Sequence, residues 1–182
     1  MSAETTFAAI LGALIGGGAS LGATVFAQQA NEERRARQDA LAAKKAALLI
    51  ACELEEFAIL CASQIADNAH VARNSGTVYI TLPTCSPISD IEGWHLVDPE
   101  LLQFASALTN VGHVANARLS ALAGRATADQ AAAGHDHAAA DYGLQALGAA
   151  KALRKQYNLP EFALDRDWDF PELLNRTREN TK

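Results

Sequence analysis

The longest uninterrupted apolar pattern in the chain lies near its start. The 21 residues from Phe7 to Ala27 carry no charge, and basic residues follow from Arg34 onward. About 20 apolar residues in a helix cover the roughly 30 Å hydrocarbon core of a bilayer. A segment in lipid must also satisfy its backbone hydrogen bonds internally, which favours a helix. The pattern therefore predicts one membrane-spanning helix.

A cleaved signal peptide is the alternative reading of this segment, because Val25-Phe26-Ala27 places small or modest side chains near a possible cleavage position. A secretory signal normally opens with positive charge, yet only Glu4 precedes the apolar run. The run is also longer than the usual apolar core of a signal, which is about 7–15 residues. The sequence thus favours an uncleaved anchor.

Helical periodicity continues beyond the apolar run to about Val71. Apolar side chains recur there at steps of three and four residues, as in a helix with one buried face. They are Ile50, Leu54, Phe57, Cys61 and Ile65. Asn74-Ser-Gly76 then stops the helix. We expect a stalk helix that either pairs with a partner helix or receives the rest of its own chain.

Two further long helices are predicted after an irregular connector. Asp98 as N-cap and Pro99 at the first helical position open one of them, which ends at Gly124. Thr127-Ala-Asp-Gln130 forms a capping box for the next, which reaches about Tyr157. A short helix is expected near residues 171–178, with Trp168 packing the tail onto the bundle.

The periodicity also predicts which side chains form the core. The expected inner face of the second long helix comprises Leu101, Phe104, Ala105, Leu108, Val111, Ala115, Leu119 and Leu122. That of the third comprises Tyr142, Ala146, Ala149, Leu153 and Tyr157. Phe57, Leu108 and Leu153 should be buried together between the three helices.

The expected fold class is therefore all-α. A transmembrane helix continues into a long stalk helix, which packs in an antiparallel three-helix bundle with a short C-terminal helix. The predicted domains are a transmembrane anchor at 1–30, the stalk helix at 31–73, an irregular connector at 74–97, and a helical hairpin with its C-terminal tail at 98–182.

Charge sets the expected orientation and excludes one class of partner. All 15 Lys and Arg residues follow the apolar run, and a basic flank favours the cytoplasmic side. We expect a single-pass protein of the bacterial inner membrane with a cytoplasmic body. The residues that contact lipid headgroups and fix this topology are Arg34, Arg35, Arg37, Lys44 and Lys45. A net charge of −6 makes a nucleic-acid partner unexpected.

Glycines recur four residues apart within the apolar run. Gly12 and Gly16 form one such pair, and Gly18 and Gly22 form another. Small residues at this spacing let two membrane helices approach closely, which predicts a homo-oligomer through this helix. The alternative is that glycine is simply frequent in membrane helices.

The best candidate for metal chemistry is a pair of side chains on the third long helix. His137 and Asp141 lie four residues apart and therefore share a helix face. His113, Asn116, His95 and Cys85 are the available further donors. The alternative is a solvated polar patch around His135-Asp136-His137. Because two ligands do not complete a site, we expect no cofactor and no catalytic residue.

Cysteine gives no sign of a disulfide framework or a metal site. Cys52, Cys61 and Cys85 are an odd number and lack the pair spacing of zinc ligands. Cys52 and Cys61 should also point to opposite sides of one helix. Buried free thiols are the expectation.

Two short stretches carry a resemblance. They are Trp94-His-Leu-Val-Asp98-Pro99-Glu-Leu-Leu102 and Ala152-Leu-Arg154-Lys-Gln-Tyr157-Asn-Leu-Pro160, with Trp168 beyond. They resemble features of uncharacterised bacterial proteins that have one N-terminal membrane helix and a helical cytoplasmic body. The likeness covers the order of elements across most of the chain and implies no activity, cofactor or site.

The function expected from these patterns is that of a membrane-anchored scaffold, an adaptor or an accessory subunit of a membrane assembly, with an unidentified protein partner and no catalysis inferred. One alternative is a small metal-dependent membrane enzyme that uses His137, Asp141 and His113. Another is an extracytoplasmic coiled-coil protein of an envelope or a phage, which requires the opposite topology.

Overall fold

The chain folds mostly into helices. A computed structural model describes residues 3–74, 78–162 and 168–180, and the side chains of residues 3–25, 72–74, 104 and 109 lie outside this description. The elements are α1 (Ala3–Asn74), η1 (Ile88–Asp90), η2 (Trp94–Leu96), α2 (Pro99–Ala123), α3 (Ala128–Gln156) and α4 (Phe170–Glu179). No strand occurs within the three described ranges, so the all-α prediction is confirmed.

The chain divides into two compact units, Met1–Leu41 and Ala42–Lys182, and helix α1 contributes to both. In the first unit, every side chain from residue 26 to residue 41 is exposed. No helix in the described part of the chain is long and apolar enough to cross a membrane.

Most of the expected membrane span lies outside the described side chains. The side chains of residues 7–25 are not described, and Gly12, Gly16, Gly18 and Gly22 belong to this range. The anchor and its glycine face stay predictions.

The basic residues after the apolar run are open to solvent. Arg34, Arg35 and Lys44 are exposed. Arg37 lies 3.8 Å from Glu33 in an ion pair one helical turn apart, and 81% of its side chain is accessible. Such exposed pairs contribute little to stability, so these cations stay available to another charged surface.

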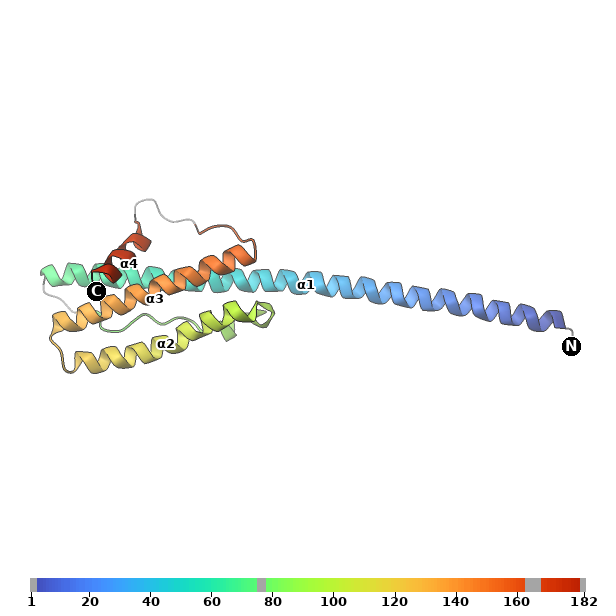
Figure 1. The fold of residues 1–182 in the computed structure, drawn as a ribbon, viewed down its shortest axis with the longest axis horizontal. Coiled ribbons are helices and arrows are strands. Elements are labelled where there is room, and N and C mark those ends of the chain that lie inside the picture. The colour runs from blue at the N-terminus through green and yellow to red at the C-terminus, as the bar shows by residue number, and fades with distance from the viewer. Residues whose placement is uncertain (1–2, 75–77, 163–167, 181–182) are drawn as a thin grey trace. The chain divides into compact units, whose positions relative to one another are not determined.

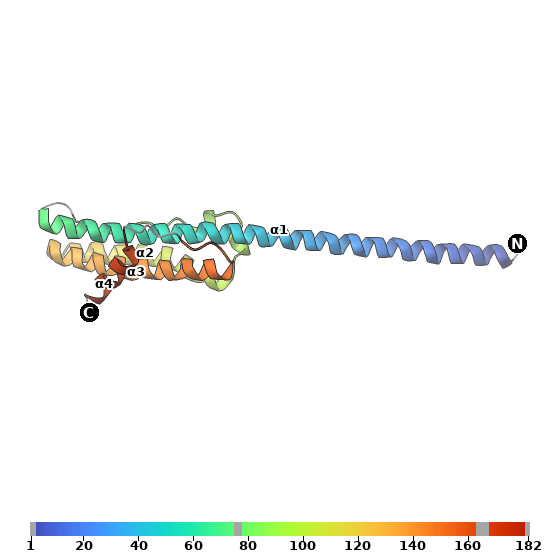
Figure 2. The same ribbon diagram turned by 90° about the horizontal axis from the view of Figure 1, so that it is seen from above.

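In the second unit, the three long helices lie side by side (Figures 1 and 2). Helix α3 runs opposite to both others. The residues that pair between α1 and α3 show this direction. Glu55 of α1 contacts Arg154 near the end of α3, whereas the later Asn68 contacts His135 near the start of α3. The stalk prediction is thus resolved in favour of its own chain as the partner.

The antiparallel prediction is correct for two helix pairs and wrong for the third, because α1 and α2 run parallel (Figure 1). The connector between them returns along the length of the bundle before α2 begins. Gly93, near the end of this connector, accordingly lies against Ala42 at the start of the second unit. The position of a Cβ atom at Gly93 would be 3.4 Å from the carbonyl oxygen of Ala42, and its φ is +81°. Only glycine combines this backbone conformation with so close an approach.

Alanine dominates the contacts between the helices. Small side chains let helix backbones approach closely, and the buried alanines include Ala47, Ala51, Ala58, Ala139, Ala146 and Ala150. A close contact between three helices is at Gly143 of α3. A Cβ atom there would lie 3.1 Å from Leu174 of α4 and 3.3 Å from Cys61 of α1. Gly143 therefore lies where three helices meet.

Local capping signals were predicted correctly. The Asp98 side chain accepts a hydrogen bond from the Glu100 amide, and Thr127 and Gln130 form the reciprocal capping box. Asp169 caps α4 by accepting from the Glu172 amide, a cap that was not predicted from the sequence. These signals depend only on neighbouring residues, which is why the sequence displays them.

The predicted inner faces are correct at some positions and wrong at others. Phe57, Leu108 and Leu153 are all buried in the core, as expected. Val111 and Leu122 of α2, however, are 38% and 41% exposed. Helix α2 carries apolar or small residues around much of its circumference, so periodicity alone does not select one face.

Candidate functional site

The metal-site prediction rests on a pair that the structure does bring together. His137 Nε2 lies 3.5 Å from Asp141 Oδ2, and each side chain is 39% exposed. His113 instead lines a small cavity of about 30 Å³, together with Phe57 and Cys85, which neither His137 nor Asp141 lines. Among the residues described, no group of three or more His, Cys, Asp or Glu side chains could hold a metal ion.

His135 is the residue that sequence reasoning misplaced. It was assigned to a solvated polar patch, but it is fully buried, with 0% of its surface accessible. Helical spacing contained the signal, because His135 lies one turn before the buried Ala139. His137 is two positions further on and half-exposed, so the three-residue motif spans an inner and an outer face of α3.

A buried polar cluster surrounds His135. Its Nδ1 lies 3.0 Å from Asp136 Oδ1, and its Nε2 lies 3.1 Å from Gln64 Oε1. Asn68, which is 2% exposed, donates to Asp136 Oδ1 at 2.7 Å and accepts from the Tyr79 amide at 2.6 Å. The cluster thus joins α1, α3 and the connector. Buried polar groups with satisfied hydrogen bonds fix one arrangement of the elements that carry them.

A second polar contact pins the connector to α2. Asn116 Oδ1 accepts from the Leu82 amide at 2.6 Å, and Asn116 Nδ2 donates to the Leu82 carbonyl at 3.3 Å. The Asn116 side chain thereby pairs with both polar groups of one backbone residue, as a neighbouring strand would. This is a structural role for a residue that the sequence offered as a further metal donor.

The shortest ion pair among the described residues joins α1 to α3. Arg154 donates through Nε and Nη2 to the two carboxylate oxygens of Glu55, each at 2.6 Å. Their side chains are only 12% and 5% exposed. Arg154 also donates through Nη1 to the Pro160 carbonyl at 2.5 Å. Hydrogen bonding to Glu55 raises the pKa of the Arg154 guanidinium, so this group stays charged.

The three cysteines are free thiols in different surroundings. Cys61 is buried and Cys52 is exposed, which confirms that they point to opposite sides of α1. The expectation of burial is therefore wrong for Cys52. Burial raises the pKa of the Cys61 thiol. Burial also raises the pKa of the Cys85 thiol, and the negative charge of Glu53 adds a smaller increase. Neither thiol is thus poised as a thiolate nucleophile at neutral pH.

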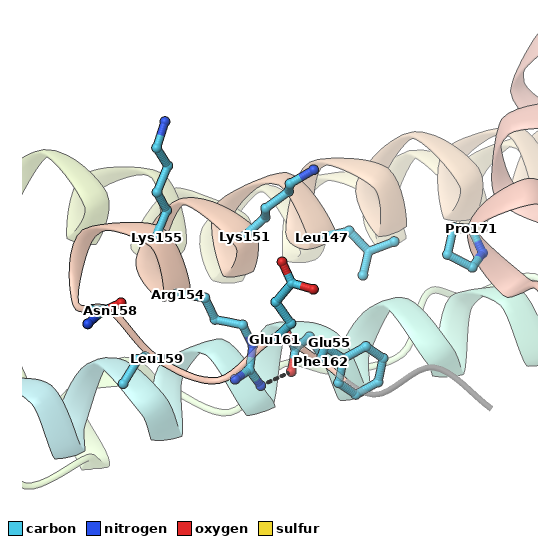
Figure 3. Close-up of a pocket in the computed structure, with 10 residues that line it drawn as sticks. All are labelled: Glu55, Leu147, Lys151, Arg154, Lys155, Asn158, Leu159, Glu161, Phe162 and Pro171. Carbon is cyan, nitrogen blue, oxygen red and sulfur yellow. Dashed lines mark hydrogen bonds and ion pairs between the residues drawn. The ribbon is translucent and has the colours of Figure 1, made fainter. Parts of the chain in front are cut away.

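The larger cavity lies beside the Arg154–Glu55 pair. It has a volume of about 750 Å³ and is bounded by the last turns of α3, by the segment that follows α3, and by the start of α4 (Figure 3). Apolar side chains from these segments line it, namely Leu147, Leu159, Phe162 and Pro171. Lys151 and Lys155 stand on one side, one helical turn apart, and Glu161 stands on the segment opposite.

The buried aromatic residue of the C-terminal tail lies two positions beyond the expected one. Phe170 is 3% exposed, whereas Trp168 is 37% exposed and lies against it with ring centroids 5.6 Å apart. Phe162 also lies against Phe170 in an edge-on arrangement, with ring centroids 6.2 Å apart. Phe170 is therefore the buried anchor.

Comparison of the chain with protein-family models, with curated protein sequences and with solved structures gives no match.

Proposed function

We propose that this chain is a membrane-anchored helical scaffold, an adaptor or accessory subunit of an assembly in the bacterial inner membrane. The observation that carries the proposal is the uncharged segment Phe7–Ala27, which belongs to the same helix, α1, as the core residues from Ala43 onward. Its length matches the hydrocarbon core of a bilayer. An anchor of this kind gives the protein a location, and the second unit gives it a body for interactions.

The exposed basic residues support a cytoplasmic body. Arg34, Arg35 and Lys44 are open to solvent, and Arg37 is held only by a weak surface pair. Lys45 lies 3.9 Å from Glu92 at the surface of the second unit, with 68% of its side chain accessible. Such cations remain on the cytoplasmic side and interact with anionic lipid headgroups.

The polar contacts of the second unit support a structural rather than a chemical role. The buried charges of Glu55 and Arg154 neutralise each other, and Asn68 and Asn116 bond the connector. These contacts maintain a defined surface, which is what a scaffold presents to its partners. On that surface, Val114 of α2 is 53% exposed beside the exposed Val111, which offers an apolar contact to a protein partner.

Reporter fusions test the topology. A fluorescent protein fused to the C-terminus should fold and fluoresce, while alkaline phosphatase at the same position should be inactive, because the positive flank keeps the body in the cytoplasm. An active phosphatase would instead support the extracytoplasmic coiled-coil alternative. A mature form that begins at Gln28 would show that the segment is a cleaved signal peptide.

Membrane extraction tests the anchor itself. The full chain should stay in the membrane fraction after alkaline carbonate washing, whereas Leu14→Arg combined with Ile15→Arg should release it, since each central Arg costs about 2.5–3.5 kcal/mol of insertion free energy. Leu41→Arg is the matched control, because Leu41 is 69% exposed and lies beyond the span. Equal retention of the double variant would contradict the anchor.

A further inference from the structure

The cavity beside α3 has the dimensions of a small-molecule site. Its volume of about 750 Å³ falls within the range of about 300–1,000 Å³ that is typical of ligand pockets. Leu147 and Pro171 line one part, and Leu159 and Phe162 line another. Three of them, Leu147, Leu159 and Phe162, are partly buried against the core. Pro171 is partly buried as well. The interior therefore suits an apolar group.

The charges at this cavity are unevenly distributed. The guanidinium of Arg154 is neutralised by Glu55 at 2.6 Å. Lys151 and Lys155 take part in none of the ion pairs found among the described residues. Figure 3 shows both lysines extending from the same side of α3. In a chain of net charge −6, two unpaired cations at the edge of an apolar cavity form a local site for an anion.

Lysine side chains suit this position for a second reason. Their aliphatic stems can lie along apolar surface while the ammonium groups reach water. A ligand with an apolar chain and an anionic end would meet both parts. Glu161 is the one carboxylate at the cavity without a described ion-pair partner. It stands on the segment after α3, and Figure 3 shows its side chain extending toward α3, so its charge would repel an anionic end.

We propose that this cavity binds a single-chain amphiphile with an anionic head, whose apolar chain contacts Phe162 and Leu159 and whose head lies between Lys151 and Lys155. The head is a carboxylate or a phosphate, and the chain is a hydrocarbon. Such a ligand is chemically a fatty acid or an alkyl phosphate. This binding activity goes beyond the scaffold role and does not depend on the membrane anchor.

Photolabelling of the full chain tests the proposal. A C12 fatty acid with a diazirine in its chain is incubated with the protein in lipid nanodiscs, irradiated, and mapped by mass spectrometry. Labelling should be saturable and concentrated in peptides that contain residues 147–162 or Pro171. Labelling that is uniform along the surface, or that does not saturate, would overturn the proposal.

Competition by unlabelled ligands identifies the head group. Laurate and dodecyl phosphate should each displace the probe at lower concentration than dodecanol. Whichever of the two acts at the lower concentration carries the preferred head group. Equal displacement by dodecanol would overturn the proposal, because the lysines would then contribute nothing.

Charge variants provide the decisive comparison. Lys151→Gln combined with Lys155→Gln should raise the half-maximal laurate concentration by up to about 25-fold at low ionic strength, at roughly fivefold per exposed charge. Glu161→Gln should lower it, since a repelling carboxylate is removed. Arg118→Gln combined with Arg125→Gln is the matched control, because both residues are exposed on α2 or just after it and change the net charge equally. Equal effects of the two double variants would overturn the proposal.

Discussion

At the scale of single residues, the second unit depends on a few buried polar contacts rather than on its apolar core alone. Glu55 and Arg154 are the clearest case, since their side chains are almost entirely removed from water. Desolvation of two charges is costly, and only their mutual contact offsets it. Removal of one partner therefore has a larger effect than removal of both.

Arg154→Met should destabilise the full chain by about 3–5 kcal/mol, because it leaves the Glu55 carboxylate buried without a partner. Glu55→Leu combined with Arg154→Met should recover most of this loss, since no buried charge remains. Urea unfolding followed by circular dichroism measures both effects. A double variant as unstable as the single one would show that packing of the side chains, and not the charge, dominates here.

His135 and His137 can be compared directly, because the first is buried and the second is half-exposed. His135→Ala should cost about 1–3 kcal/mol of unfolding free energy, because Gln64 Oε1 loses its contact with His135 Nε2 and Asp136 Oδ1 keeps only its bond from Asn68. His137→Ala combined with Asp141→Ala should change it by less than about 0.5 kcal/mol, since both side chains are half-exposed. The same unfolding measurement compares them.

Metal analysis of these variants addresses the enzyme alternative. A stoichiometric metal in the purified protein that disappears in the His137 and Asp141 double variant would favour a metal-dependent enzyme over a scaffold. Metal content that does not respond to the double variant would leave the pair with no part in metal binding.

At the scale of elements, the packing of α3 is set by how closely other helices approach it. Gly143→Ala should destabilise the chain by about 1–3 kcal/mol, because the added methyl group would lie 3.1–3.3 Å from Leu174 and Cys61. Gly148→Ala is the control on the same helix. No atom lies within 4 Å of its Cβ position, so the higher helix propensity of alanine should stabilise the chain by about 1 kcal/mol. Thermal unfolding measures both effects, and the two variants should shift the melting temperature in opposite directions.

The apolar segment of α1 has its own contact test. Gly16→Ile and Gly18→Ile should weaken self-association in a bilayer reporter assay, because bulky side chains keep membrane helices apart. Leu14→Ile should leave the signal unchanged, since it conserves size. Equal signals from all three variants would reduce these glycines to a feature of composition.

The sequence predicts the elements of this fold better than their arrangement, and the reason lies in the range of the interactions. Helix starts at Asp98 and Thr127 depend on side chains two or three residues away, so they could be identified directly. The direction of α2 depends on how the connector returns, and its length is compatible with either direction. The pattern thus specified which helices form but not which of them run parallel.

The polar contacts show the same limit more sharply. Glu55 and Arg154 are 99 residues apart in sequence, and Asn68 and His135 are 67 apart. No local pattern links such pairs, so the sequence offered none of them. It singled out His137 and Asp141 instead, because they are one turn apart on a single helix. The cavity beside α3 was equally hidden, since it is lined by residues from α1, α3, α4 and the segment after α3.

At the scale of the whole molecule, the long separation between α1 and its partners has a consequence for synthesis on the ribosome. The α2 and α3 helices follow each other directly and can pair as soon as both have emerged. Arg154 is synthesised 99 residues after Glu55, which at about 5–20 residues per second is a delay of roughly 5–20 s. During this interval the face of α1 that packs against α3 stays uncovered, and transiently exposed apolar surface of this kind is prone to aggregation.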